Sequence, residues 1–351
     1  MKYKFEDIIY NITEKKKPSE EDRLNYIGLE HLDSGSLFVT RWGAERTPEG
    51  EKIVMKKGDV LFGKRRAYQK KVAISPIDGV FSAHGMVLRP KEDVICKEFL
   101  PFFISSDYFL NEAIRISVGG LSPTINWKDI KVLEFNLPSL AEQKVLAEKL
   151  WAAYEVKQSY LKMIEATEEM VKSQFIEMFG NPQTNSQGRK SVRFDEVLTL
   201  QRGHDLPEKE RKDEGVIPIY GSNGFVGYHT ESKAKDGIVT GRSGTIGKVY
   251  CIKGDYWPLN TSLYSIDTHG NNLTYLKFMV EAFDVSRFSN GTGVPTLNRN
   301  DIHKEMIPFV DVSEQEAFEI IAHQADKSIS ELRKSIDAID KVIKSFINEN
   351  L

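Results

Sequence analysis

Residues 118–130, VGGLSPTINWKDI, and residues 291–302, GTGVPTLNRNDI, are two copies of one signature, and they decide how the chain is organised. The offset between the copies is 172 residues, from Thr124 to Thr296, and it continues without a gap into the segments that follow. An internal repeat of this kind predicts two similar structural units. The shared positions are Pro123, Thr124, Asn126, Asp129 and Ile130, which fall on Pro295, Thr296, Asn298, Asp301 and Ile302.

Earlier segments also match, although with different offsets, as loop insertions would produce. KFEDI (4–8) resembles RFDEV (193–197), and GDVLFGKRR (58–66) resembles DGIVTGRSG (236–244). Chance similarity between two amphipathic tails would not explain a signature held in register with those tails. We therefore interpret the chain as a duplication, in which each half has a variable globular part followed by a similar tail.

The two tails are predicted to be long helices. Residues 139–179 contain neither proline nor glycine, and a Gly-Asn-Pro run follows them. Ser139 and Glu142 match a capping box, and Asp311 and Glu314 occupy the equivalent positions in the second half. About 40 helical residues span ~60 Å, which exceeds the width of a small domain. Two such helices most economically pack on each other, antiparallel, although each could instead pack on its own globular part.

Apolar residues recur along both tails at steps of four and three residues, as a coiled-coil interface requires. Lys157 interrupts the first seam, where it either fixes the register or faces solvent. The predicted helix-pair interface comprises Leu146, Leu150, Tyr160, Ile164, Val171 and Phe175 in the first helix and Phe318, Ile329, Leu332, Ile336, Ile339 and Ile343 in the second.

The globular parts are predicted to be mixed α/β. Short β-rich runs such as VLFG, GMVLRP, GIVTG and SLYSI are bounded by Gly, Pro or Asn, and helices are expected at 98–115 and 273–288. Antiparallel helices joining two such parts would give the chain an internal pseudo-two-fold axis. The expected divisions are a globular domain at 1–138, a long helix at 139–180, a linker at 181–192, a second globular domain at 193–310 and a C-terminal long helix at 311–351.

Composition excludes several classes of protein. Of the 351 residues 40% are hydrophobic, which is too apolar for a disordered chain, and a net charge of −3 is not that of a histone-like protein. Cys96 and Cys251 are too few for a disulfide framework or a cysteine-built zinc site, and the seven histidines are scattered, so we expect no metal. No apolar run approaches the ~20 residues that cross a bilayer, and the N-terminus lacks a secretory pattern. We expect a cytoplasmic protein without a membrane partner.

One fragment resembles a phosphate-binding loop. Residues 241–248 read GRSGTIGK, but Arg242 stands where the P-loop pattern needs glycine, and Val249 follows the lysine where Ser or Thr is needed. The loop could still bind a nucleotide, although a tight turn between two strands is simpler. No nucleophile–base pairing is legible, so we expect a non-catalytic chain with no cofactor.

Charge is distributed unevenly. Residues 56–71, KKGDVLFGKRRAYQKK, carry seven basic residues against Asp59, whereas the helices at 141–179 and 313–351 have net charges of −2 and −3. Basic residues neutralise phosphates, so the KRRAYQKK part, with Tyr68 interleaved, favours nucleic acid over a charged edge strand. The predicted DNA-binding residues of the first half are Lys64, Arg65, Arg66, Tyr68, Lys70, Lys71, His84 and Thr124.

In the second half the candidate surface is spread over several polar loops that contain glycine. Such loops suit close approach to a nucleic-acid backbone together with hydrogen bonds to base edges. Any one of them is also explained as a simple turn, so their concentration in one half is the signal. The predicted DNA-binding residues there are Arg202, His204, Ser222, Asn223, Arg242, Ser243, Thr245, Lys248, Asn260, Thr261, Thr292 and Thr296.

Taken together, these features resemble the specificity (S) subunits of Type I restriction–modification systems. The most telling pieces are FGKRRAYQKKVAI (62–74) with SAHGMVLRP (82–90), GRSGTIGKVY (241–250), and the paired PTIN and PTLN motifs. Their order, with a long helix ending each half, is more specific than any one of them. The resemblance covers essentially the whole chain.

The resemblance implies two target-recognition domains separated by two antiparallel helices, each domain reading one half of a split target in double-stranded DNA. The helices would set the spacing and dock two modification subunits, which methylate adenine with S-adenosylmethionine. Restriction subunits would add ATP-dependent translocation and cleavage, and this chain would hold no active site. The alternative from the residues alone is a helical scaffold that organises partner subunits without reading DNA.

Overall fold

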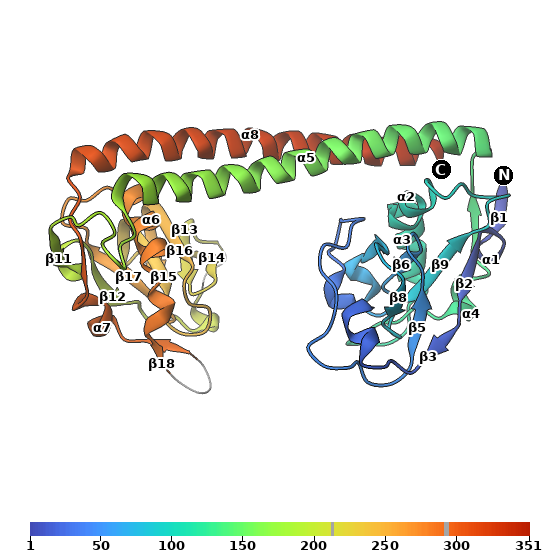
Figure 1. The fold of residues 1–351 in the computed structure, drawn as a ribbon, viewed down its shortest axis with the longest axis horizontal. Coiled ribbons are helices and arrows are strands. Elements are labelled where there is room, and N and C mark those ends of the chain that lie inside the picture. Colours follow the sequence, from blue (N-terminus) through green and yellow to red (C-terminus); the bar gives the residue numbers. More distant parts are fainter. Residues whose placement is uncertain (212–213, 291–294) are drawn as a thin grey trace. The chain divides into compact units, whose positions relative to one another are not determined.

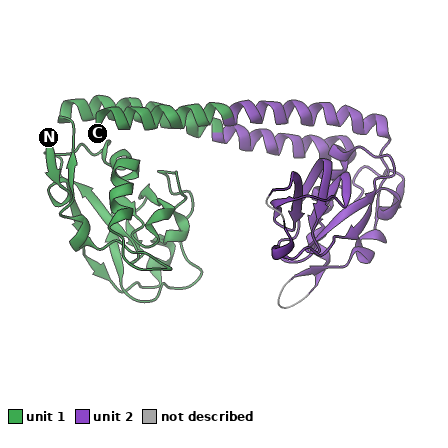
Figure 2. Cartoon of the chain, turned by 180° about the vertical axis from the view of Figure 1, so that it is seen from behind, with its two compact units in different colours: residues 1–160, 334–351 green, residues 161–333 purple. Residues whose placement is uncertain are grey.

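The computed structural model describes residues 1–211, 214–290 and 295–351, which divide into two units (Figures 1 and 2). Unit 1 comprises Met1–Tyr160 and Lys334–Leu351, and unit 2 comprises Leu161–Arg333. Each unit has a mixed α/β globular part and one end of each of two long helices, α5 (Leu140–Phe179) and α8 (Val312–Asn350). The predicted fold class, two similar mixed α/β parts with two long helices, is confirmed.

Unit 1 contains two four-stranded sheets and one strand pair. The first sheet has the order β2 (Ile9–Ile12), β9 (Met86–Pro90), β6 (Val60–Phe62), β7 (Val72–Ile74). The second has the order β3 (Lys15–Lys16), β5 (Lys52–Met55), β8 (Gly79–Phe81), β4 (Tyr26–Ile27). Strand β1 (Lys2–Lys4) pairs antiparallel with β10 (Glu134–Asn136). The helices are α1 (Phe5–Ile8), α2 (Leu100–Ser105), α3 (Asp107–Arg115) and α4 (Trp127–Ile130).

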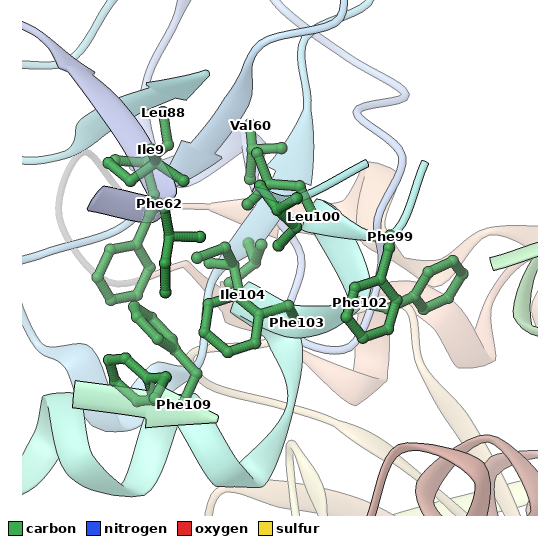
Figure 3. Packing of buried hydrophobic residues seen from close by; sticks show 14 of the residues in the cluster. Ile9, Val60, Phe62, Leu88, Phe99, Leu100, Phe102, Phe103, Ile104 and Phe109 are labelled. Carbon is green, nitrogen blue, oxygen red and sulfur yellow. The ribbon is translucent and has the colours of Figure 1, made fainter. Parts of the chain in front are cut away.

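The helix expected at 98–115 is wrong as a single element, because Ser106 divides it. Its backbone is extended, and its hydroxyl accepts a hydrogen bond from the Phe109 N–H at 3.1 Å, which caps α3. The two short helices deliver a run of phenylalanines to the core beside β6 (Figure 3). Phe109 lies 5.5 Å from Phe103 and 5.6 Å from Phe62 between ring centroids, within the range of favourable aromatic pairs.

Unit 2 is built on one six-stranded sheet. Its order is β12 (Thr199–Arg202), β17 (Ser262–Asp267), β15 (Ala234–Gly241), β16 (Val249–Pro258), β13 (Ile217–Gly221), β14 (Gly224–His229). Two strand pairs join β11 (Ser191–Arg193) to β20 (Met306–Pro308) and β18 (Ser289–Asn290) to β19 (Thr296–Leu297). The helices are α6 (Leu273–Phe283) and α7 (Arg299–His303). The helix expected at 273–288 ends early, because Asp284 adopts a left-handed backbone and a 3-10 turn follows.

The two globular parts share a topology that follows from the duplication. The order β2-β9-β6-β7 in unit 1 and the order β12-β17-β15-β16 in unit 2 place the first, fourth, second and third strands of each set side by side. The terminal pairs β1–β10 and β11–β20 correspond in the same way. Helices α4 and α7 each begin three residues after the signature threonine, at Trp127 and Arg299. The sequence repeat is therefore a repeat of structure.

The long helices pack on each other within each unit. In unit 1 Leu146 and Leu150, near the start of α5, share a core with Ile347, near the end of α8. In unit 2 Val171, near the end of α5, shares a core with Phe318, near the start of α8. The pairing is thus antiparallel. Within the described residues no helix is long and apolar enough to span a membrane.

The predicted seam residues all turn inward to some degree. Lys157, the polar interruption, is only 14% exposed at its side chain, and its ammonium group lies 2.7 Å from Asp340 of α8. Tyr154, absent from the prediction, is buried, and its hydroxyl accepts the Leu37 N–H at 2.6 Å. Buried are Leu146, Leu150, Ile164, Val171, Phe175, Phe318, Ile329 and Ile336, and half-buried are Tyr160, Leu332, Ile339 and Ile343.

A glutamine at the start of each long helix ties that helix to its globular part. Gln143 is completely buried, accepts the Cys96 N–H at 2.9 Å, and donates to the carbonyls of Val94 at 2.9 Å and Pro138 at 3.0 Å. The amide is therefore satisfied on both its oxygen and its nitrogen. Since a buried polar group without partners is costly, these three bonds favour one orientation of the helix.

Gln315 repeats this arrangement in unit 2. It too is completely buried, accepts the Asn272 N–H at 2.8 Å, and donates to the Val310 carbonyl at 2.9 Å and the Asn271 side chain at 2.7 Å. The donor-to-carbonyl bond spans five residues in both units, from Gln143 to Pro138 and from Gln315 to Val310. The duplication has kept this anchor.

The helix caps differ between the halves. Ser139 and Glu142 form the predicted capping box, with the Ser139 N–H donating to Glu142 at 2.8 Å. Glu314, in the equivalent position, forms a two-bond ion pair with Arg189 at 2.9 Å. Arg189 belongs to the segment 181–192, which we predicted to be the linker between halves. That segment lies within unit 2, and the chain passes between units inside α5 and α8.

We predict that Gln143→Met lowers the free energy of unfolding by at least about 2 kcal/mol, because the Cys96 N–H and two carbonyls lose their buried partner. Gln324→Met is the matched control, since Gln324 is exposed on α8 and its loss should change stability by less than about 0.5 kcal/mol. Urea unfolding followed by circular dichroism measures both. Equal midpoints for the two variants would contradict the anchoring role.

Candidate nucleic-acid interface

The signature forms a hairpin in both units. In unit 1 the Val118 N–H donates to the Thr124 carbonyl at 3.0 Å, and the Thr124 N–H donates back to Val118 at 2.9 Å. In unit 2 Asn290 and Thr296, each 172 residues further on, pair in the same way as part of β18 and β19. The predicted contact Thr292 lies outside the described residues. The signature therefore encodes a common backbone feature.

Each hairpin is bound to the loop that carries the predicted contacts. In unit 1 the Ile125 N–H donates to the Lys64 carbonyl at 2.9 Å, and the Arg66 N–H donates to the Pro123 carbonyl at 2.7 Å. Between them, Arg65 and Thr124 form an isolated antiparallel β-bridge. These bonds hold residues 64–66 against the signature. They involve only backbone groups, and of the side chains Arg66 also donates from Nε to the Ser122 hydroxyl at 3.3 Å.

The same bonds recur in unit 2. The Leu297 N–H donates to the Arg242 carbonyl at 2.8 Å, and the Gly244 N–H donates to the Pro295 carbonyl at 3.3 Å. Ser243 and Thr296 form an isolated antiparallel β-bridge. Residues 242–244 thus occupy the places of residues 64–66, as the match between GDVLFGKRR and DGIVTGRSG indicates. One backbone frame presents Lys-Arg-Arg in unit 1 and Arg-Ser-Gly in unit 2.

The frame of unit 1 is crowded with positive charge. Arg65 and Arg66 are exposed, and the Arg65 Nη1 atom lies 3.5 Å from the His84 Nε2 atom. Burial, followed by the charges of Arg65, Lys64 and Lys52, lowers the pKa of His84. Burial, followed by the charge of Lys15, lowers the pKa of Lys64. The positive charges that disfavour protonation of His84 and Lys64 would be offset by an anionic ligand.

Two of these basic residues were missing from the sequence prediction. Lys15 lies on β3 and Lys52 on β5, which are neighbouring strands of the second sheet. They are far from residues 64–66 in the chain, and a single Lys on a strand is no signal in itself. Only the sheet pairing brings their charges to the same region as Lys64 and His84.

The remaining residues of KRRAYQKK are arranged differently. Tyr68 is 54% exposed on a 3-10 turn at Ala67–Gln69. Lys70 lies 2.7 Å from Asp107, and Lys71 donates to the Leu29 carbonyl at 2.6 Å. Their ammonium groups are therefore engaged within the protein, which leaves Lys64, Arg65, Arg66 and Tyr68 as the candidate contacts of this run.

In unit 2 several predicted contacts are joined by hydrogen bonds into one network. Arg242 donates from its backbone to the Thr261 carbonyl at 2.8 Å and from Nη1 to the Asn260 carbonyl at 3.1 Å. Asp205 accepts hydrogen bonds from Asn260 and, at 3.2 Å, from Arg202. Loops that are separate in sequence are thus held together at the end of the sheet.

The network extends to other predicted contacts, although less tightly. The Ser222 N–H donates to the Thr261 hydroxyl at 3.4 Å, and Ser222 itself is buried. The His204 Nε2 atom lies 3.2 Å from the Tyr264 hydroxyl. Asn223 and Lys248 are exposed, whereas Thr245 is half-buried. Among the described residues, no side-chain hydrogen bond joins Asn223, Thr245 or Lys248 to this network.

The loop at 241–248 is a connection between two strands, β15 and β16. Phosphate-binding loops of the P-loop type lead into a helix, whose N-terminus contributes to anion binding. A strand follows here instead, and a Cβ atom at Gly241 would lie 1.8 Å from the Thr245 carbonyl oxygen, so the glycine serves a tight turn. The structure thus favours the turn over the nucleotide-binding hypothesis. The described residues contain no group of three or more His, Cys, Asp or Glu placed to hold a metal.

Comparison with known proteins confirms the resemblance. Residues 2–164 and 187–340 match the family model described as Type I restriction modification DNA specificity domain. Over 157 residues the chain is 26% identical to the Type I restriction enzyme StySPI specificity subunit of Salmonella potsdam and 27% identical to the EcoKI specificity subunit of Escherichia coli strain K12. Each match covers 41% of this chain and 33% of the relative, so the matched stretch spans a third of their length.

Solved structures share the fold. The Type I restriction–modification S subunit from M. genitalium superposes with a TM-score of 0.55 at 16% identity, covering 99% of this chain and 94% of that one. A structure reported on complex assembly and conformational transition of the Type I system gives a TM-score of 0.58 at 16% identity, covering 100% and 97%. At this identity the likeness concerns the fold alone.

We predict that DNA binding by unit 1 strengthens as the pH falls. A bound phosphate would raise the depressed pKa of His84, so binding takes up a proton. Affinity should rise, by up to about tenfold per unit of pKa difference, as the pH falls through the bound-state pKa, and should be flat above it. Anisotropy titrations between about pH 8 and 6 measure this. His84→Ala should abolish the dependence, whereas His269→Ala, changed beside Asp267 in unit 2, should keep it.

Proposed function

The chain belongs to the Type I restriction modification DNA specificity family, and from this premise we propose that it selects the DNA sequence on which a Type I restriction–modification complex acts. Each unit reads one half of a bipartite target in double-stranded DNA. The chain itself is non-catalytic, binds no cofactor, and recruits two adenine methyltransferase (modification) subunits. Restriction subunits join the same complex.

The observation that carries this proposal is the shared frame with different contents. The same backbone bonds hold residues 64–66 in unit 1 and 242–244 in unit 2, yet the side chains presented are Lys-Arg-Arg and Arg-Ser-Gly. Arg and Lys contact phosphates and guanine edges, whereas Ser contacts either base type and Gly allows a backbone to approach closely. Two related units with different side chains at one position suit two different half-sites.

Outward-facing apolar residues of α5 support recruitment of partner subunits. Met163 and Met170 are each 51% exposed and seven residues apart, so they lie on one face of the helix. In unit 1 Val145 and Val156 of the same helix are also exposed. Methionine adapts to the surface of a partner, and a stripe of this spacing suits a packed helix. A duplicated chain would offer related surfaces to two copies of one modification subunit.

We predict that Arg65→Ala and Arg66→Ala together, or Arg242→Ala alone, weaken target binding at least tenfold, because guanidinium groups that contact phosphates or bases are lost. Adenine methylation of the target should fall accordingly, while assembly with the modification subunits is unchanged. Binding is measured by anisotropy, methylation by methyl transfer to an oligonucleotide, and assembly by light scattering. These residues are not part of the helices that we assign to assembly.

Arg115→Ala and Arg193→Ala are the matched controls for units 1 and 2. Each is an exposed arginine that pairs with a neighbouring carboxylate, Glu112 at 2.6 Å and Asp195 at 2.8 Å. Both variants should bind DNA as the parent does. If the Arg65, Arg66 and Arg242 variants methylated normally, the chain would instead be a scaffold that does not read DNA.

We further predict that exchanging residues 1–135 for the same region of a family member changes one half of the methylated sequence only. That region holds the loop, hairpin and sheets of unit 1, whereas the second frame lies entirely in unit 2. Mapping of modified adenines in a host genome, with the parent and with the exchanged gene, measures the result. A change in the other half-site would refute independent reading.

A further inference from the structure

Unit 2 contains a hollow of about 410 Å³ beside the signature hairpin. Three arginines line it, Arg202, Arg242 and Arg299, together with Leu263 and Leu297, which are buried and form an apolar floor. The other described residues of the lining are Asn and Thr, so no described lining residue carries a carboxylate. Asp205 pairs with Arg202, so within the described residues the charges of Arg242 and Arg299 remain without a carboxylate partner, and they favour an anion in the hollow.

Each arginine is brought to the hollow by a different element. Arg202 ends β12, and its guanidinium lies 3.2 Å from Asp205. Arg242 follows β15, and only its Nη1 atom is bound, to the Asn260 carbonyl at 3.1 Å. The remaining N–H groups of Arg242 have no hydrogen-bond acceptor within the described part of the chain. Two of the three guanidinium groups are thus held in place by short local contacts.

Arg299 supplies the third charge. It is the first residue of α7, directly after Asn298, whose side chain accepts the Asn300 N–H at 3.1 Å and caps the helix. Across residues 1–211, 214–290 and 295–351, no carboxylate lies within ion-pair distance of Arg299. The pKa of His303 is lowered chiefly by burial, and Asp195 opposes this by raising it. The positive charges of Arg299 and then Arg193 lower the pKa further. The guanidinium group of Arg299 therefore has no carboxylate partner among the described residues and is free to bind a ligand.

We propose that this hollow binds a phosphodiester of the DNA backbone, so that unit 2 is positioned on the duplex by Arg242 and Arg299. The inference rests on the proposed function. Guanidinium groups match phosphate oxygens with two parallel hydrogen bonds each, and the apolar floor of Leu263 and Leu297 suits the adjoining sugar. A base edge presents a specific pattern of donors and acceptors, which charged guanidinium groups on different elements do not match. The hollow positions the protein, and the neighbouring polar loops read the sequence.

Unit 1 does not repeat this set of charges. Position 299 corresponds, at the 172-residue offset, to Trp127, whose ring packs 5.9 Å from Phe5 in the core of unit 1. Position 242 corresponds to Lys64, whose ammonium group carries one positive charge but lacks the planar set of N–H donors of a guanidinium group. The arginine-lined hollow is thus a property of unit 2, and the two units present different basic side chains to DNA.

The test uses Arg299→Gln in the full chain, assembled with its modification subunits. Anisotropy titrations with target and non-target duplexes are repeated over a range of salt concentrations. We expect roughly tenfold weaker binding to both duplexes and a salt slope, log K against log [salt], that is smaller by about 0.9. The methylated sequence should be unchanged. Arg299→Lys, which keeps the charge, should restore most of the salt slope.

Arg193→Gln is the control, because Arg193 is an exposed arginine of unit 2 that pairs with Asp195 and does not line the hollow. Its affinity and salt slope should equal those of the parent, and circular dichroism melting should agree for all variants. Relaxed specificity at one base pair with an unchanged salt slope would show that Arg299 reads a base, and would overturn the proposal. Parent-like binding by Arg299→Gln would overturn it too. Failure of the proposed function is distinct, since the parent complex would then show no target preference.

Discussion

A buried side-chain amide fixes each long helix to its globular part, and the rest of the structure depends on that attachment. Gln143 and Gln315 are inaccessible to solvent, and each makes three hydrogen bonds to groups outside its own helix. An amide in a dry environment must satisfy donor and acceptor together, so a rotation of the helix would break several bonds at once. A hydrophobic contact alone would tolerate such a rotation, because apolar packing is less directional.

The signature solves a second problem, which is how to hold a variable loop in a constant place. The bonds from Ile125 and Leu297 to the loop carbonyls involve only backbone atoms. Backbone groups are the same at every residue, so side chains at 64–66 and 242–244 can diverge without loss of the frame. This separation of constant backbone and variable side chain is what a protein needs if its two units are to recognise different sequences with one architecture.

Sequence was sufficient for features that depend on periodicity or repetition. The duplication, the long helices and the seam from Leu146 to Ile343 follow from spacing, because coiled-coil packing imposes that spacing. The features that the sequence did not predict depend on the local chemistry of single side chains. Ser106 interrupts an otherwise continuous helical pattern by capping α3, and Asp284 ends α6 in a left-handed conformation. Tyr154 enters the core through a bond to Leu37, a partner more than a hundred residues away.

The candidate site was harder to predict, because charges pair across the fold. Lys70 belongs to the most basic run in the sequence, yet Asp107 engages it, whereas Arg299 stands in an ordinary stretch and has no carboxylate partner among the described residues. What matters for binding an anion is the charge left after internal pairing, and that depends on tertiary contacts. In unit 1 the unpaired charge gathers around Arg65 and His84, and in unit 2 around the hollow with Arg242. Duplication supplied the same frame twice, and internal pairing then determined which charges each frame leaves available to a ligand.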